Sequence, residues 1–429
     1  MHRSLFSPIS LFIALLGWLL LVGSKPARAQ SEPIPHQEID PSGKAGFSLF
    51  DNEFYKNQLF LLGETHGFKN TQAVDLALLK HLNQRIGVRY YIAEVDPTKA
   101  YYINQYLQTG QDSTLRLVFV SWIAETMQWA NRDFFRKIQA IRAYNQTIPA
   151  KKRIRFVGID EVQDRQLIAR QLTELLENQS IKTDSPRLDS LVTLLRTTPQ
   201  KSDTLAAQVA LNWLAQIKNH PVDYRKWPAE TLTELCATLQ TLAYRKTIRS
   251  REKTIFTTFR DALVRYNLTN EKLYGFWGVA HVWQAPLADG RLKFAGMIQA
   301  SDLPMKGKTV SITCSYVDSF MMVPSQYLPP FWQEKGKVYS RVDKFNSNGP
   351  MMTVSGTDEL IKQSRPNTLT LFKLPGTAAG KAPITATYSP FMPADQRYNF
   401  DPARPTTDYF QYIVLIRNSE MTEPMEIKN

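Results

Sequence analysis

Four short apolar runs alternate with longer segments of helical periodicity over the first two thirds of the chain. The runs cover residues 59–62, 88–95, 154–159 and 273–282. Between the first two, Val74, Leu78, Leu82 and Ile86 recur at helical spacing, which predicts a helix over 71–86. The segments 98–146 and 165–270 also have mainly helical patterns. Short apolar runs separated by helices are typical of a mostly parallel sheet flanked by helices on both faces.

The pattern changes beyond residue 290, where Gly, Pro and Asn become frequent. Further strands are predicted at 293–298, 309–318, 368–373 and 408–416. This part either completes the sheet, as we expect, or forms a small appended β-rich region. The predicted fold class is therefore α/β, with a mostly parallel central sheet, a helical insertion at 165–270 and a β-rich C-terminal part at 290–429.

The N-terminus has the pattern of a targeting segment. His2 and Arg3 precede an apolar stretch over 9–22, and Ala27-Arg28-Ala29 has the small-x-small form of a signal peptidase site. We predict a signal peptide over residues 1–29, which is removed to leave Gln30 first. An uncleaved anchor is the alternative, although the stretch is short for a spanning helix.

Residues 30–46 are polar and contain three prolines, which predicts a linker ahead of a single domain at 47–429. No second apolar run is long enough to cross a bilayer, so we expect no membrane span after signal cleavage. A cleaved signal peptide implies an exported protein, periplasmic or extracellular if the source is bacterial.

Composition narrows the class of partner. The chain has 429 residues, of which 43% are hydrophobic and 21% charged, an ordinary globular composition. Residues 1–29 contain Arg3, Lys25 and Arg28 and no acidic residue, so their removal lowers the net charge from +13 to +10. This charge favours anionic surfaces or substrates, and solvated surface lysines are the alternative explanation. No basic run is interleaved with aromatics, so we expect no nucleic-acid partner. The two cysteines, Cys236 and Cys314, exclude a disulfide-dense scaffold, and whether they pair is left open.

Each of the four apolar runs ends in ionisable side chains. These are Glu64 and His66, then Glu94, then Asp160, and finally His281. Ligands of open α/β sheets bind beyond the carboxyl ends of the strands, so these groups are expected to converge on one site. The alternative is that charges at strand ends only mark where the chain meets water. Gly63, Gly158 and Gly278 precede the charged groups and permit close approach of the backbone.

Two further patterns add to this hypothesis. Glu64 and His66 are two residues apart, so in extended backbone they point to the same side. Arg251 extends the apolar stripe of Ile255 and Phe259 by one helical turn, and an arginine on a buried face needs an anionic partner. A solvated basic cluster is the alternative interpretation of Arg251.

These motifs, in this order, resemble the erythromycin esterase-like proteins. The matching segments are Gly63-Glu64-Thr65-His66-Gly67, Glu94, Gly158-Ile159-Asp160, Arg251-Glu252, Gly278-Val279-Ala280-His281 and a closing strand near 408–416. The broader group includes the ChaN haem-uptake lipoproteins. The resemblance implies an α/β fold and hydrolysis of a cyclic ester by water. It implies His66 as the base, Glu64 and Glu94 as orienting carboxylates, Arg251 and His281 as polar site residues, and a catalytic or structural Asp160.

These residues are compatible with two main functions. The first is hydrolysis of a small-molecule ester with His66 as general base. The alternative is a metal- or haem-binding protein of the ChaN-like type. Glu64, His66, Glu94 and His281, with Asp160, offer nitrogen and carboxylate ligands to a divalent metal, and Tyr101 or Tyr102 offers an axial ligand to haem. An inactive descendant that binds at the cell surface is a third possibility. The sequence assigns no cofactor and no oligomeric state.

Overall fold

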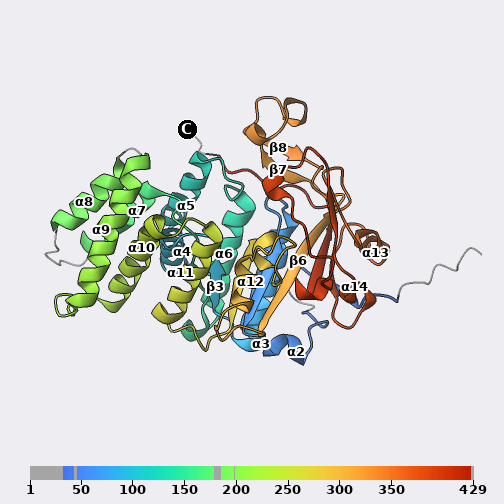
Figure 1. The fold of residues 1–429 in the computed structure, drawn as a ribbon, viewed down its shortest axis with the longest axis horizontal. Coiled ribbons are helices and arrows are strands. Elements are labelled where there is room, and N and C mark those ends of the chain that lie inside the picture. Colours follow the sequence, from blue (N-terminus) through green and yellow to red (C-terminus); the bar gives the residue numbers. More distant parts are fainter. Residues whose placement is uncertain (1–31, 43–45, 178–184, 198, 427–429) are drawn as a thin grey trace, which may run out of the picture. The chain divides into compact units, whose positions relative to one another are not determined.

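An eight-stranded sheet lies at the centre of the fold (Figure 1). The strand order is β1-β10-β12-β6-β2-β5-β3-β4. The strands are β1 (His36–Glu38), β2 (Leu59–Glu64), β3 (Tyr90–Ala93), β4 (Arg155–Gly158), β5 (Leu273–Gly278), β6 (Thr309–Val317), β10 (Leu369–Lys373) and β12 (Tyr412–Arg417).

Most of this sheet is parallel. The neighbours β12, β6, β2, β5, β3 and β4 pair in parallel, whereas β10 is antiparallel to both β12 and β1. The carboxyl ends of the parallel strands therefore meet at one edge of the sheet. The predicted fold class is confirmed, and the C-terminal part completes the sheet through β6, β10 and β12.

The computed structural model describes residues 32–42, 46–177, 185–197 and 199–426. Residues Ile34–Asn429 form one compact unit. The predicted signal peptide over 1–29 lies outside the described residues, so its cleavage stays a prediction. Within the described ranges, none of the helices combines the length and the hydropathy of a membrane span.

The sheet is buried on both faces because alternate residues of its strands point to opposite sides. In β2, Phe60 and Leu62 join one hydrophobic cluster, and Leu59 and Leu61 join another. The first cluster includes side chains of α2 (Asn52–Lys56), α3 (Asn70–Ile86), α4 (Pro97–Thr109), α5 (Asp112–Ala124) and α6 (Arg132–Thr147). The second includes side chains of α11 (Arg251–Arg265), α12 (Phe294–Gln299), α13 (Thr357–Lys362) and α14 (Ala378–Lys381).

The helical insertion has an apolar core of its own. Leu172, Leu191, Trp213 and Leu239 are buried together in a third cluster. They belong to α7 (Arg165–Glu177), α8 (Ser185–Arg196), α9 (Pro199–Asn219) and α10 (Ala229–Thr247). Two small antiparallel pairs complete the C-terminal half, namely β7 (Met321–Pro324) with β8 (Tyr339–Val342), and β9 (Met352–Val354) with β11 (Ala386–Tyr388).

The structure differs from the sequence predictions at three places. The strand predicted at 293–298 is wrong, since Phe294–Gln299 form α12 and bury Phe294 and Ile298 against the sheet; a short apolar run does not distinguish a helix from a strand by its periodicity. Within the predicted linker, His36–Glu38 pair with β10 as β1. The helical stretch 98–146 is divided into α4, α5 and α6.

Candidate functional site

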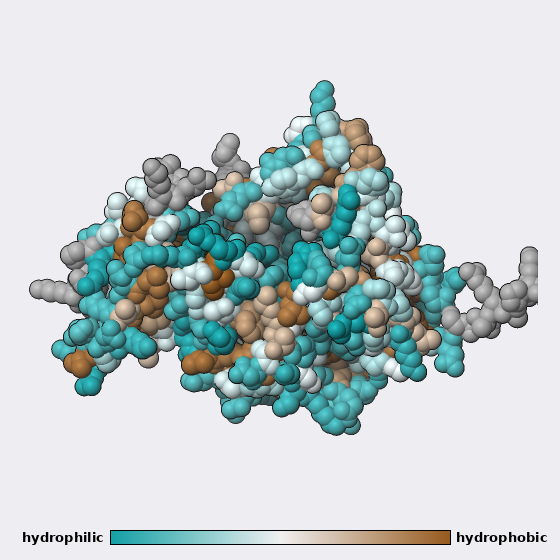
Figure 2. Space-filling model, viewed as in Figure 1, coloured by the Kyte–Doolittle hydropathy of each residue, from teal (hydrophilic) through white to brown (hydrophobic). Residues whose placement is uncertain are grey.

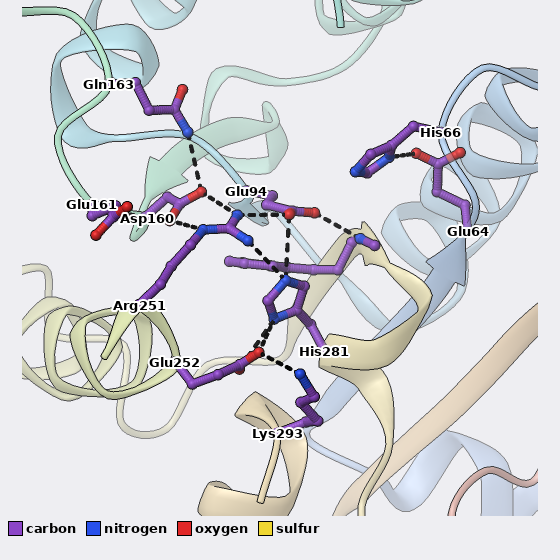
Figure 3. Close-up of polar contacts among 12 residues, drawn as sticks. Glu64, His66, Glu94, Asp160, Glu161, Gln163, Arg251, Glu252, His281 and Lys293 are labelled. Atoms are coloured by element: carbon purple, nitrogen blue, oxygen red, sulfur yellow. Dashed lines mark hydrogen bonds and ion pairs between the residues drawn. The ribbon is translucent and has the colours of Figure 1, made fainter. Parts of the chain in front are cut away.

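A cluster of ionisable side chains lies at the carboxyl edge of the parallel strands (Figure 3). Glu64 ends β2, His66 follows it, and Glu94 follows β3 directly. Asp160 comes two residues after β4, and His281 lies in the short 3₁₀ helix η2 (Val279–Val282) after β5. Arg251 is the first residue of α11. The structure thus brings together all six site residues that the sequence predicted.

Glu64 and His66 form the first pair of this cluster. The Nδ1 atom of His66 lies 2.5 Å from Oε1 of Glu64, whose side chain is almost fully buried. Burial lowers the pKa of His66, but the negative charge of Glu64 and this hydrogen bond outweigh it and raise the pKa above its usual value of 6.5. A carboxylate on Nδ1 assigns the proton to that nitrogen and leaves the lone pair on Nε2.

The loop between α5 and α6 also contacts His66. The indole of Trp129 packs against the imidazole with ring centroids 4.4 Å apart. Gln128 donates from Nε2 to the carbonyl oxygens of His66, at 3.2 Å, and Met322, at 2.6 Å. The hydroxyl of Tyr316 on β6 accepts from the backbone N–H of Thr65 at 3.1 Å. The α5–α6 loop and β6, both distant in sequence, therefore fix the position of this histidine.

Arg251 organises the second part of the cluster. Its guanidinium donates from Nε and Nη2 to the two oxygens of Asp160, at 3.0 and 2.7 Å, and from Nη2 to Oε1 of Glu94 at 2.8 Å. Asp160 is fully buried. A positive charge at the N-terminus of a helix interacts unfavourably with the helix dipole. The negative charges of Asp160 and Glu94 offset this cost. Arg251 has the anionic partners that the first interpretation predicted, but it is not buried, since 41% of its side chain is exposed.

Glu94 is held as a carboxylate in this arrangement. Its Oε2 accepts from the backbone N–H of Gly278 at 2.6 Å. Burial alone would raise the pKa of Glu94, but electrostatic interactions with His281, His66 and Arg251 and the hydrogen bond from the Gly278 N–H lower it to about 2. Glu94 contacts Arg251, Gly278 and, at 3.5 Å, Nε2 of His281. The carboxylate on the His66 ring is that of Glu64.

Both ring nitrogens of His281 have partners. Nε2 lies 3.2 Å from Nη1 of Arg251, and Nδ1 lies 3.0 Å from Oε1 of Glu252. Since Arg251 has only donors, Nε2 is the acceptor and the proton is assigned to Nδ1. Lys293 lies 3.4 Å from the same oxygen of Glu252. His281 is therefore arranged to position Arg251, and it does not present a free N–H for stabilising a developing oxyanion.

Gly278 lies between the two imidazoles. A Cβ atom placed on this glycine would be 3.5 Å from Nε2 of His66 and 3.5 Å from Cδ2 of His281. The two rings therefore border the same small space beside the end of β5. Figure 3 shows the Glu64–His66 pair on one side of this space and the Arg251 cluster on the other.

The cluster opens into a cavity of about 670 Å³. Glu64, His66, Glu94, Arg251 and His281 line it, and Asp160 lies behind Arg251. The remaining wall is mostly apolar and comes from the C-terminal half, including Met321, Leu328, Trp332, Met351, Tyr388 and Phe400. The cavity thus joins a charged end to an apolar body.

The donor set does not fit a metal ion. Among the described residues, no group of three or more His, Cys, Asp or Glu side chains is arranged to hold one. The reason is Arg251, because its guanidinium occupies the space between Glu94, Asp160 and His281. Neither Tyr101 nor Tyr102 lines the cavity, and the Tyr102 hydroxyl donates to Glu174 at 3.0 Å. The residues considered for haem therefore lie away from this site.

The two cysteines are not bonded to each other. Cys236 lies in α10, half-buried, and Cys314 lies buried in β6, and both are free thiols. Burial raises the pKa of each thiol above its usual value, so neither is held as the nucleophilic thiolate.

Sequence reasoning missed several residues that complete the site. Trp129 and Gln128 lie in a loop without a recognisable motif, and Lys293 is the first residue of the segment that was predicted as a strand. Glu252 was visible beside Arg251 in the family motif, but its contact with His281 is apparent only in three dimensions.

Fold and site together define a mostly parallel α/β protein with a histidine–carboxylate–arginine cluster at the carboxyl edge of its sheet. The erythromycin esterase family matches residues 84–272, a range that includes Glu94, Asp160 and Arg251 and ends before His281. No curated protein matches the chain in sequence.

Three solved structures share the fold over nearly their whole length. A protein from Bacillus cereus is 13% identical, with a TM-score of 0.64 and coverage of 88% of this chain and 93% of that one. A succinoglycan biosynthesis protein is 15% identical, with a TM-score of 0.61 and coverage of 92% and 96%. A histidine-to-asparagine mutant of erythromycin esterase EreC in its open conformation is 12% identical, with a TM-score of 0.61 and coverage of 92% and 100%. The chain is therefore similar to the erythromycin esterase family over residues 84–272 and shares the fold of these three structures.

Proposed function

We propose that this chain is an exported hydrolase in which His66 is the general base for attack of water on an ester-like bond. The Glu64–His66 pair carries the proposal. With its proton on Nδ1 and directed to Glu64, the imidazole presents an unprotonated Nε2 beside Gly278 in the cavity. A positioned base of this kind contributes about 10²–10⁴ in rate. The apolar segment at 9–22 with its Ala27-Arg28-Ala29 site supports export.

The proposed reaction balances with these groups alone. Nε2 of His66 takes a proton from water as the water oxygen bonds to the carbonyl carbon, and the carbonyl electron pair moves to its oxygen. When the tetrahedral intermediate collapses, the C–O bond to the leaving alcohol breaks and the imidazolium returns the proton to the departing oxygen. The products are a carboxylic acid and an alcohol.

Arg251 is the group placed to stabilise the negative oxygen. Its four hydrogen bonds to Asp160, Glu94 and His281 use four of the five guanidinium N–H groups. The remaining N–H is on Nη1, and Arg251 lines the cavity. Burial works against the charged guanidinium, but Asp160 and Glu94 raise the pKa of Arg251 further, so it stays protonated. A charged donor held in advance is the kind of group that lowers the barrier of acyl transfer.

The pH dependence of the reaction tests the role of Glu64. We expect kcat/KM to rise with pH through an apparent pKa above 6.5, because Glu64 raises the pKa of His66 and only the neutral ring is a base. The substitution Glu64→Gln removes the negative charge, which lowers the pKa of His66 and moves this limb to lower pH. Rate profiles of both proteins on one uncharged ester measure the shift. An unmoved limb would exclude His66 as the titrating base.

A methyl group at Gly278 tests whether water reacts beside His66. The added Cβ of Gly278→Ala would meet its neighbours at ordinary contact distance, 3.5 Å from Nε2, and the backbone φ of −52° accepts alanine. We therefore expect an unchanged melting temperature and a kcat lower by about 10²-fold, because the methyl displaces the attacking water. Wild-type kcat in this variant would place the reaction elsewhere.

The direct test of the proposal is turnover of a panel of cyclic and linear esters by the purified protein. Since much of the cavity wall is apolar, we expect cleavage of small molecules with an apolar body in preference to short, polar esters. Amides of the same acids serve as the matched comparison. No cleavage of any ester under conditions where the protein is folded would refute the proposed hydrolase.

A further inference from the structure

The segment between β7 and β8, residues 325–338, carries apolar side chains into solvent. Figure 1 shows it projecting beyond the sheet next to the β7 and β8 labels. It contains the 3₁₀ helices η3 (Ser325–Tyr327) and η4 (Pro330–Trp332). Tyr327 is 72% exposed and Phe331 is 78% exposed, and the chain turns at Gly336 with a φ of +73°. We call residues 325–338 the projecting segment.

Exposed apolar side chains are concentrated in the projecting segment and beside the cavity. Eight large apolar side chains are exposed among the described residues, and three of them, Tyr327, Phe331 and Val338, lie in the projecting segment. A fourth, Phe391, lines the same cavity as Tyr327. Single exposed apolar side chains are normal on a soluble surface, but a group of them marks a binding surface.

Basic side chains accompany these aromatics. Lys335 and Lys337 flank the turn at Gly336, and both are exposed. Arg341 follows in β8 but forms a bidentate pair with Glu420, so the two lysines are the basic groups of the segment itself. Its acidic residue, Glu334, accepts from the backbone N–H of Arg341 at 2.9 Å. Figure 2 shows apolar and hydrophilic side chains side by side at the top of the projection.

We propose that the projecting segment docks this protein on an anionic lipid surface. Aromatic rings are enriched at the boundary between headgroups and acyl chains, and each lysine near an anionic leaflet adds attraction. Lysine stems also extend along apolar surface while the ammonium stays in water. The net charge, +13 for the whole chain and +10 without Arg3, Lys25 and Arg28 of residues 1–29, has the sign that this surface requires.

Docking would place the cavity mouth against the lipid. Tyr327, Leu328 and Trp332 belong both to the projecting segment and to the cavity wall, so an apolar molecule leaving the membrane would meet one continuous apolar surface. This consequence for substrate entry rests on the proposed hydrolysis, whereas the docking itself does not.

Co-sedimentation with vesicles tests the docking without any turnover. The protein beginning at Gln30 is used, because it retains the whole unit Ile34–Asn429 and lacks the apolar leader. We expect it to sediment with phosphatidylglycerol vesicles and much less with phosphatidylcholine vesicles. The variant Phe331→Ser lowers the partition coefficient about tenfold. The double variant Lys335→Gln with Lys337→Gln lowers it about thirtyfold, on the anionic vesicles only.

Val264→Ser is the matched control, since Val264 is 74% exposed on α11 and lies outside the segment. It is expected to sediment as the wild type does. Equal binding of Phe331→Ser and Val264→Ser, or no binding to either vesicle, would overturn the proposal. Concentration-dependent dimers that Phe331→Ser abolishes, without vesicle binding, would assign the segment to a second copy of the chain instead.

Discussion

Replacing His66 by alanine is expected to lower kcat by about 10²–10⁴-fold while the protein stays folded. The side chain is 27% exposed and lines the cavity, so its removal leaves no large void. Glu64 loses its partner, but it lies at the edge of the cavity, where water replaces the imidazole. Steady-state rates on the best ester of the panel, with circular dichroism for the fold, measure the two effects separately.

The control for this prediction is His220→Ala. His220 is exposed and lies in the turn after α9, away from the cavity lining. It is expected to keep wild-type kcat and stability. If His66→Ala retained full activity beside this control, the proton would be taken by another group and the proposed mechanism would fail.

Replacing Arg251 by methionine is expected to reduce both stability and activity. The variant leaves Asp160, fully buried, and Glu94 without their shared cation. Removing one partner of a buried ion pair costs about 3–5 kcal/mol, and we expect the lower end because part of Arg251 is exposed to solvent. Loss of the oxyanion donor adds a decrease in kcat of about 10²–10³-fold. Urea unfolding and steady-state rates report the two losses.

A second variant separates these two roles of Arg251. Arg251→Lys keeps the positive charge but cannot donate to Asp160 and Glu94 in the same forked geometry. It should recover most of the lost stability and little of the lost kcat. A fully active lysine variant would show that only the charge matters, whereas a stable methionine variant would show that the buried carboxylates are neutral or differently paired.

The parallel core of the sheet was predictable because its strands are buried on both faces. Such strands are continuous apolar runs, as in Leu59-Phe60-Leu61-Leu62, and they are visible without knowledge of their neighbours. The edge strand His36–Glu38 has no such run, since it contributes backbone hydrogen bonds to β10 and little apolar surface. The helix Phe294–Gln299 was missed because six residues give less than two turns of periodicity.

The convergence of the candidate site followed from the same reasoning. Once β2, β3, β4 and β5 are parallel, the residues after their ends must meet at one edge, which brings Glu64, Glu94 and His281 together. The sequence could not predict which nitrogen atoms of the histidines and Arg251 form hydrogen bonds with which carboxylate oxygens. The contacts of Trp129 with His66 and of Glu252 with His281 depend on how a loop and a helix pack across the sheet, and no spacing in the chain encodes that.

The polar cluster and most of the apolar lining of the cavity come from different stretches of chain. His66, Glu94, Arg251 and His281 all precede residue 282, whereas Met321, Trp332, Tyr388 and Phe400 follow it. Side chains after residue 282 can therefore change in size without changing the acid–base residues that precede it. Descendants of one ancestor could in this way diverge widely in what they accept while retaining the same chemistry.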